Sequence, residues 1–121
     1  MNEKFIQARK SVSELIFKVL SKNLSVKDAL KRFPPDIDDP SVHCMWHALI
    51  HYEADEDYRA RELDYAEEQD DYLEMLGYIL REGEPIPQNI ILEYQNKYEI
   101  ALVPRSKGII NWCKNLLRST I

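Results

Sequence analysis

Residues 39–54 read DPSVHCMWHALIHYEA, and this stretch decides the fold class. Asp39 followed by Pro40 favours the start of a helix, because the aspartate side chain accepts from free backbone N–H groups and proline fits the first helical position. On a helical wheel the apolar side chains form one continuous arc: Val42, Met45, Trp46, Leu49 and Ile50. We therefore expect a helix that is central to the fold and continues to about residue 58.

Helical spacing of apolar residues also occurs on the N-terminal side of this stretch. It predicts a helix over residues 3–22 and a second, short helix that has Ser25 as its N-cap. Pro34 and Pro35 should end the second helix, because proline cannot donate the backbone N–H that a helix requires. The DIDDP segment of residues 36–40 then reads as a connector.

On the C-terminal side the same spacing predicts a break within residues 57–64 and then a helix to about Glu82, followed by Gly83 as its C′ residue. A further helix should begin near Pro87, and Ser106 can cap a last one. No stretch alternates convincingly between apolar and polar residues, as a strand would. The sequence therefore predicts one all-α domain over residues 1–121, a compact bundle of five or six helices. It leaves open whether residues 40–82 form one bent helix or two.

The net charge of −5 hides a strong segregation along the chain. Residues 1–33 carry eight Lys/Arg and three Asp/Glu, residues 34–101 carry four and eighteen, and residues 102–121 carry four and none. Either the basic ends pack beside the acidic middle and neutralise it, or the surface is bipolar and meets a charged partner. The negative net charge argues against nucleic acid as a partner, although a local basic patch could still contact phosphates.

Several features predict a cytoplasmic protein without a membrane partner. No apolar run approaches the ~20 residues that cross a bilayer. The N-terminus interleaves charges with its apolar residues, whereas a signal peptide has a continuous apolar segment. Cys44 and Cys113 follow no metal or redox spacing, so we expect free thiols in a reducing compartment.

All three histidines lie in the central helix, at positions that stack along one side: His43, His47 and His51, with Asp55 as the next position. Neighbouring positions are about 6 Å apart along the helix axis, so two of them can converge on one metal ion and a third cannot easily join. The wheel places His43 and His47 at the edge of the apolar arc. One interpretation is therefore that these two are half-buried packing residues while His51 is exposed.

The alternative interpretation is a metal site. It would use His47, His51 and Asp55, completed by carboxylates of the following helix; such ligands suit Zn, Fe or Mn. The completing carboxylates would come from Glu67, Glu68 and Asp71. In this interpretation the cofactor is a divalent transition metal, and the matching activity would be that of a metal-dependent helical-bundle enzyme.

Residues 53–74 carry eleven acids and two arginines. The pairs Glu53/Glu56 and Glu68/Asp71 each share a helix face, and together they resemble the ExxE…ExxD pattern of all-α nucleoside triphosphate pyrophosphohydrolases. That resemblance implies Mg²⁺-dependent phosphate chemistry. It is confined to residues 53–71, its gap is shorter than that family's usual one, and no basic phosphate-binding residues follow. The ordinary interpretation of a charge run is a solvated helix face.

Tyrosines are concentrated in the same acidic region, which is a composition typical of protein contacts. The alternative is that their rings cover the edge of the core with the hydroxyl groups in water. No complete catalytic set or nucleotide-binding motif is present. We therefore expect a protein-binding or regulatory module more than an enzyme, contacting another protein or a second copy of itself. The expected contact residues are Tyr58, Tyr65, Glu67, Glu68, Asp70 and Asp71.

Overall fold

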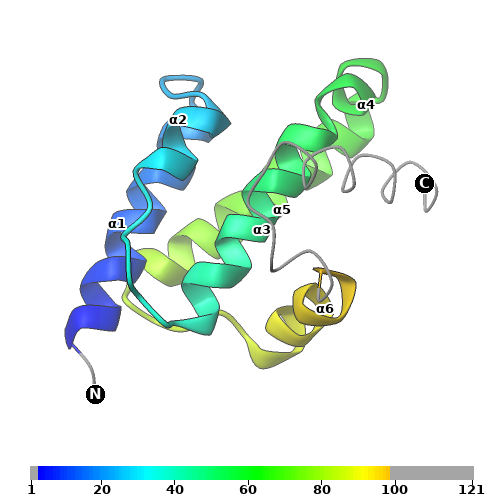
Figure 1. Cartoon of the computed structure of the whole chain (residues 1–121). Helices are drawn as coiled ribbons and strands as arrows, with labels where there is room; N and C mark the ends of the chain where they lie inside the picture. Colours follow the sequence, from blue (N-terminus) through cyan, green and yellow to red (C-terminus); the bar gives the residue numbers. More distant parts are fainter. Residues whose placement is uncertain (1–2, 99–121) are drawn as a thin grey trace.

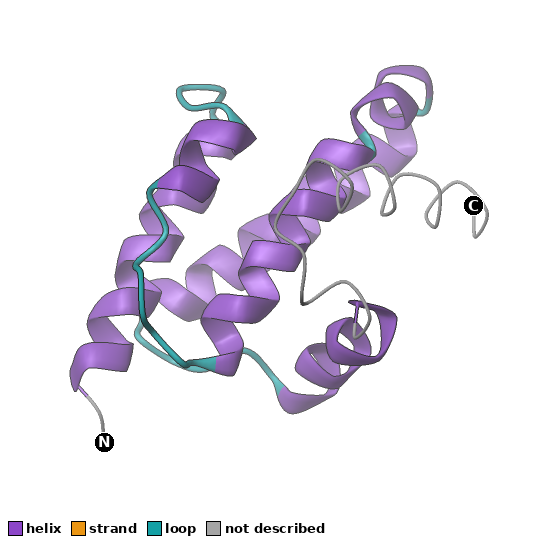
Figure 2. Cartoon of the chain, viewed as in Figure 1, coloured by secondary structure: helices purple, strands orange, loops and turns teal. Residues whose placement is uncertain are grey.

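The computed structural model describes residues 3–98, which form six helices and no strand. The helices are α1 (Glu3–Leu20), α2 (Val26–Lys31), α3 (Pro40–Ala54), α4 (Glu56–Arg61), α5 (Leu63–Arg81) and α6 (Gln88–Tyr98). Figure 1 shows their arrangement, and Figure 2 shows that only loops join them. The predicted all-α class is confirmed. The helix expected after Ser106 lies outside the described residues.

Local signals in the sequence set most of the helix ends. Ser25 caps α2 by accepting a hydrogen bond from the backbone N–H of Asp28, and Asp39 caps α3 by accepting from that of Ser41. Gly83 follows the C-cap of α5 with a φ of 79°, a left-handed conformation that glycine adopts without strain. These three predictions are confirmed, because each depends on contacts within a few residues.

The central helix is α3, as its wide apolar arc predicted. Ten of its fifteen residues are buried. It lies in front of α5 in Figure 1, with α1 and α2 on one side and α6 below. Met45 and Leu49 of α3 join Ile16, Leu76 and Leu80 as fully buried side chains. Across the core, α5 approaches α1 closely at Gly77, where an added Cβ would lie 3.0 Å from the Phe17 ring.

The chain between residues 54 and 63 follows the prediction only in part: the break at Glu62 lies within the expected residues 57–64, but an earlier break was not expected. The central helix ends at Ala54 and not near residue 58, and two breaks follow, at Asp55 and at Glu62. Residues 40–82 are therefore neither one bent helix nor two, because the short α4 lies between the breaks. The physical reason is tertiary: Asp55 turns its side chain inward, where donors from α5 reach it.

A buried ion pair joins parts of the fold that are far apart in sequence. Arg9 of α1 donates to both carboxylate oxygens of Asp39, at 2.8 and 3.3 Å, and to the carbonyl oxygen of Gly83, at 3.0 Å. The backbone N–H of Ile86 donates to the Ser41 hydroxyl at 2.9 Å. These contacts fix α1, the start of α3 and the α5–α6 connection together.

Within residues 3–98, no helix has both the length and the apolar character that crossing a bilayer requires.

Candidate functional site

The densest set of polar contacts lies where α3, α4 and α5 meet. At its centre is Asp55, which is 3% exposed. One oxygen of its carboxylate lies 3.1 Å from Nε2 of His51 and accepts hydrogen bonds from the Tyr65 hydroxyl and, at 3.3 Å, from Nε2 of Gln69. The break after Ala54 places Asp55 at the junction, and α5 supplies Tyr65 and Gln69 from the opposite side. We call the whole set the corner cluster; it comprises His51, Tyr52, Asp55, Tyr58, Arg59, Tyr65, Gln69 and Asp70.

Arg59 of α4 connects the α3 and α5 parts of the corner cluster. Its Nη1 donates to the backbone carbonyl of Tyr52 and, at 3.0 Å, to Oε1 of Gln69. Its guanidinium carbon lies 3.5 Å from the centre of the Tyr52 ring, a cation–π geometry. The Tyr52 hydroxyl in turn donates to Asp70 at 2.7 Å. The short α4 is therefore held to both of its neighbouring helices by side-chain contacts.

The side chains of the corner cluster favour the ionised form of the Asp55 carboxylate. Burial alone would raise the pKa of Asp55, but hydrogen bonds from His51, Tyr65 and Gln69 and the proximity of the His51 charge together lower it below its ordinary value. Burial and the bond to Asp55 raise the pKa of Tyr65. Asp55 is thus an ionised acceptor surrounded by hydrogen-bonding side chains. With its charge satisfied inside the fold, this carboxylate acts as a structural anchor for the three helices.

The structure separates the three histidines. His43 is exposed and lies with Nε2 3.1 Å from the carbonyl oxygen of Ile37. His47 is buried, and burial, followed by the neighbouring His43, lowers its pKa to about 4. His51 is half-buried beside Asp55. The interpretation that His43 is half-buried and His51 exposed is therefore wrong. A helical wheel gives the direction of a side chain, but the neighbouring elements decide which turns of α3 are covered.

The predicted metal ligands are only partly brought together. His51 and Asp55 form a pair, whereas Glu67, Glu68 and Asp71 are exposed, on a side of α5 that lies away from Gln69. In the part of the chain that the structure describes, no three His, Cys, Asp or Glu side chains lie close enough to hold a metal ion. The carboxylate pairs of residues 53–71 likewise form no such group. A metal site therefore stays a prediction that rests on one pair.

The expected protein-contact residues divide into two groups. Tyr58 and Tyr65 pack against each other with ring centres 4.7 Å apart, and Asp70 accepts from Tyr52, so these three belong to the corner cluster. Glu67, Glu68 and Asp71 are exposed.

On α5 the exposed acids share one side with further exposed residues that the sequence reasoning missed, at spacings of three and four. We call this side the outer face of α5: Leu63, Asp64, Glu67, Glu68, Asp71, Glu74, Met75 and Tyr78. A wheel drawn for residues 63–81 alone would have revealed it.

One hollow adjoins the corner cluster, between the α1–α2 turn and α3–α4, with a volume of about 450 Å³. Its wall includes Lys22 and Arg59 but also Asp28, Glu53 and Glu56, so charges of both signs face it. This mixture favours no single class of small ligand.

No protein-family model matches the chain, and neither a curated protein nor a solved structure shows significant similarity to it.

Proposed function

We propose that this protein is a binding module that docks the outer face of α5 onto a basic surface of a partner protein. The observation that carries the proposal is where the exposed apolar side chains lie. Among residues 3–96, whose side-chain exposure the structure describes, three of the four large exposed hydrophobic residues belong to this face: Leu63 at 76%, Met75 at 43% and Tyr78 at 48% exposure. Single exposed apolar residues are ordinary, but several on one helix face are typical of contact surfaces.

The charges of the outer face support a basic partner. Its five carboxylates are exposed, and none of them forms an ion pair with another described residue. Like charges spaced three and four residues apart on a helix repel one another. Lys and Arg side chains of a partner would relieve this repulsion, and a complementary potential would also speed the encounter and exclude acidic surfaces.

The C-terminal part of the outer face is held in a fixed arrangement. The Tyr78 ring lies 5.1 Å from that of Phe17, centre to centre. The Arg81 guanidinium lies 4.7 Å from the Tyr78 ring centre and 5.2 Å from that of Phe17. An aromatic side chain that is already positioned loses little conformational entropy on binding, which suits it to anchor a contact.

The corner cluster supports the proposal from inside the fold. Its bonds to Tyr65, Gln69 and Asp70 hold the N-terminal half of α5 against α3 and α4. This arrangement turns the acids of the outer face toward solvent. It also means that Asp70 should be left intact in a test, because replacing it would remove the acceptor of the Tyr52 hydroxyl.

The test is affinity capture from native lysate with the full chain and with the charge-reversed variant Glu67→Lys/Glu68→Lys/Asp71→Lys. We expect the wild-type chain to retain a protein at low salt and the variant to lose most of it, on the order of tenfold or more. A matched control reverses three exposed acids elsewhere, Glu14, Asp38 and Glu84. Equal capture by the two triple variants would overturn the proposal, as would the absence of any captured protein.

A further inference from the structure

We infer that the outer face of α5 receives the α1–α2 end of a second copy of this chain, so that copies associate head to tail. The inference rests on the proposed function and names one partner for the same face. Its basis is a second surface of the molecule, which has the opposite charge and a smaller, half-buried apolar component.

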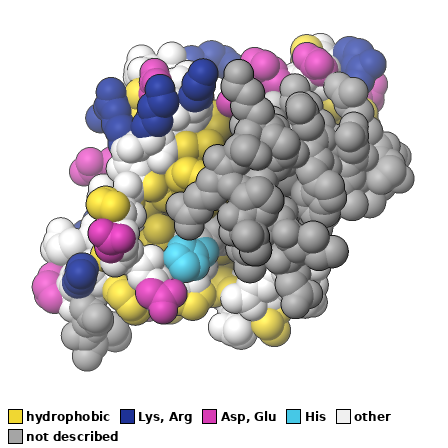
Figure 3. Space-filling view, in the orientation of Figure 1, with side chains coloured by type: hydrophobic (Ala, Val, Ile, Leu, Met, Phe, Trp, Pro, Cys, Tyr) yellow, Lys and Arg dark blue, Asp and Glu magenta, His cyan; other side chains and the backbone are white. Residues whose placement is uncertain are grey.

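That second surface, which we call the basic end, consists of Lys18, Lys22, Lys27, Lys31 and Arg32. All five side chains are exposed, and Asp28 is the only acid among residues 15–35. Figure 3 shows Lys and Arg side chains gathered at the α2 corner of the molecule. In the described part of the chain none of the five forms an ion pair. The basic end therefore carries about as many free cations as the outer face of α5 carries free carboxylates.

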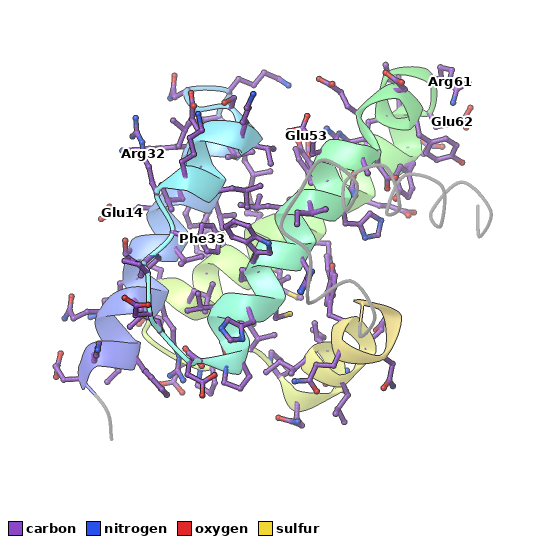
Figure 4. All side chains as sticks on the ribbon, in the orientation of Figure 1. Glu14, Arg32, Phe33, Glu53, Arg61 and Glu62 are labelled. Carbon is purple, nitrogen blue, oxygen red and sulfur yellow. The ribbon has the colours of Figure 1, made fainter. Side chains whose placement is uncertain are left out.

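Apolar side chains also lie beside the cations, although they are less exposed than those on α5. Leu24, Leu30 and Phe33 are only half-buried. The Phe33 ring lies edge-on to Trp46 at 5.4 Å between ring centres, so its position is fixed. In Figure 4, Arg32 and Phe33 lie on the α2 side of the molecule, across from Glu53, Arg61 and Glu62 near α4. Cations and apolar groups are thus available together at this end.

The two surfaces do not neutralise each other within one copy, since no ion pair joins them among the described residues. Between copies, each surface can bind the other. Because the two surfaces are different, the contact is heterologous, and repeating it produces an open chain or a ring of copies. An association of this kind depends on exposed charges, so salt should weaken it.

Two complementary variants test the inference with the full-length chain. The face variant is Glu67→Gln/Glu68→Gln/Asp71→Asn, which keeps its basic end. The end variant is Lys27→Gln/Lys31→Gln/Arg32→Gln, which keeps its outer face; neutral substitutions are used so that the two altered surfaces do not attract each other. Analytical ultracentrifugation at low salt should show concentration-dependent oligomers for the wild-type chain and monomers for each variant alone. Mixing the two variants should produce a 1:1 dimer and nothing larger, because the mixed pair has one intact contact and no way to extend it.

Salt provides a second measurement. Raising NaCl from about 20 mM to about 500 mM should weaken wild-type association at least tenfold, on the order expected when exposed charges are screened. Circular dichroism melts establish that both variants fold, and single substitutions at the same positions replace either triple variant if it does not.

A wild-type chain that stays monomeric at low salt and high concentration would overturn the inference, as would a mixture that contains only monomers. A monomeric wild-type chain that still captures a protein through its outer face would leave the proposed function intact. The two proposals can therefore fail separately. If the mixture formed oligomers larger than a dimer, the head-to-tail geometry would be wrong.

Discussion

His47 is a buried ionisable side chain, 7% exposed in the middle of α3. Burial and the nearby His43 lower its pKa from 6.5 to about 4. In the unfolded chain the same imidazole titrates near its ordinary value. Between these two pKa values the unfolded state binds a proton that the folded state does not, so lowering the pH through this window favours unfolding.

We therefore expect the free energy of unfolding to fall by about 2 kcal/mol between pH 7 and pH 5 from this residue, given 1.36 kcal/mol for each pKa unit. A His47→Gln variant should lose this part of the pH dependence, while the exposed His43→Gln variant should retain it. Urea unfolding at several pH values measures the effect. If His47→Gln showed the same loss of stability as the wild-type chain in this range, the buried neutral state of His47 would be refuted.

The histidines also show what a residue pattern can predict. Their spacing correctly placed all three on one helix and paired His51 with Asp55. It could not predict which of them is buried, because that depends on which other parts of the chain pack over each turn of α3. Nor could it identify Arg59 and Gln69 as partners in the corner cluster, since neither stands out in sequence.

At the scale of elements, the caps of α2, α3 and α5 follow from single residues that the sequence displays. Ser25, Asp39 and Gly83 act on backbone groups within three residues of themselves, and all three were predicted. The break at Asp55 was not, because helix-compatible residues continue through this position. Only the donors on α5, ten and fourteen residues further along, make the inward turn of Asp55 favourable.

Replacing Gly83 should destabilise the end of α5. Its φ of 79° is unfavourable for residues with a Cβ, and an added Cβ would lie 2.8 Å from Cγ2 of Ile6. We expect Gly83→Ala to lower the free energy of unfolding by about 1–3 kcal/mol. The matched control is Glu82→Ala: Glu82 is exposed and has right-handed helical φ and ψ, so its loss should matter by less than about 0.5 kcal/mol. Equal unfolding midpoints in urea for the two variants would contradict this account.

At the scale of the whole molecule, the Arg9–Asp39 pair connects three distant segments. Asp39 is 1% and Arg9 is 8% exposed, so removing either partner leaves a buried charge without its counterion. Breaking such a pair typically costs about 3–5 kcal/mol. We expect Arg9→Met to destabilise the protein to this extent. Asp39→Ser should behave similarly even though serine can still cap α3.

The double variant Arg9→Met/Asp39→Ser provides the decisive comparison, because it leaves no unpaired charge. It should be more stable than the sum of the two single effects predicts, by more than about 1 kcal/mol. Chemical denaturation of the four proteins gives this coupling energy. Purely additive losses would show that the two side chains stabilise the fold independently.

The sequence by itself determined the all-α class, the order of the helices α1, α2, α3, α5 and α6 and most of their ends, because apolar periodicity and capping act within a few residues. It also indicated the acidic, Tyr-rich region in which the proposed contact lies. Only the tertiary structure decided that Tyr58, Tyr65 and Asp70 belong to an internal cluster while Leu63, Met75 and Tyr78 join the acids at the surface. Burial and long-range hydrogen bonds depend on which helices meet, and that is a property of the folded chain as a whole.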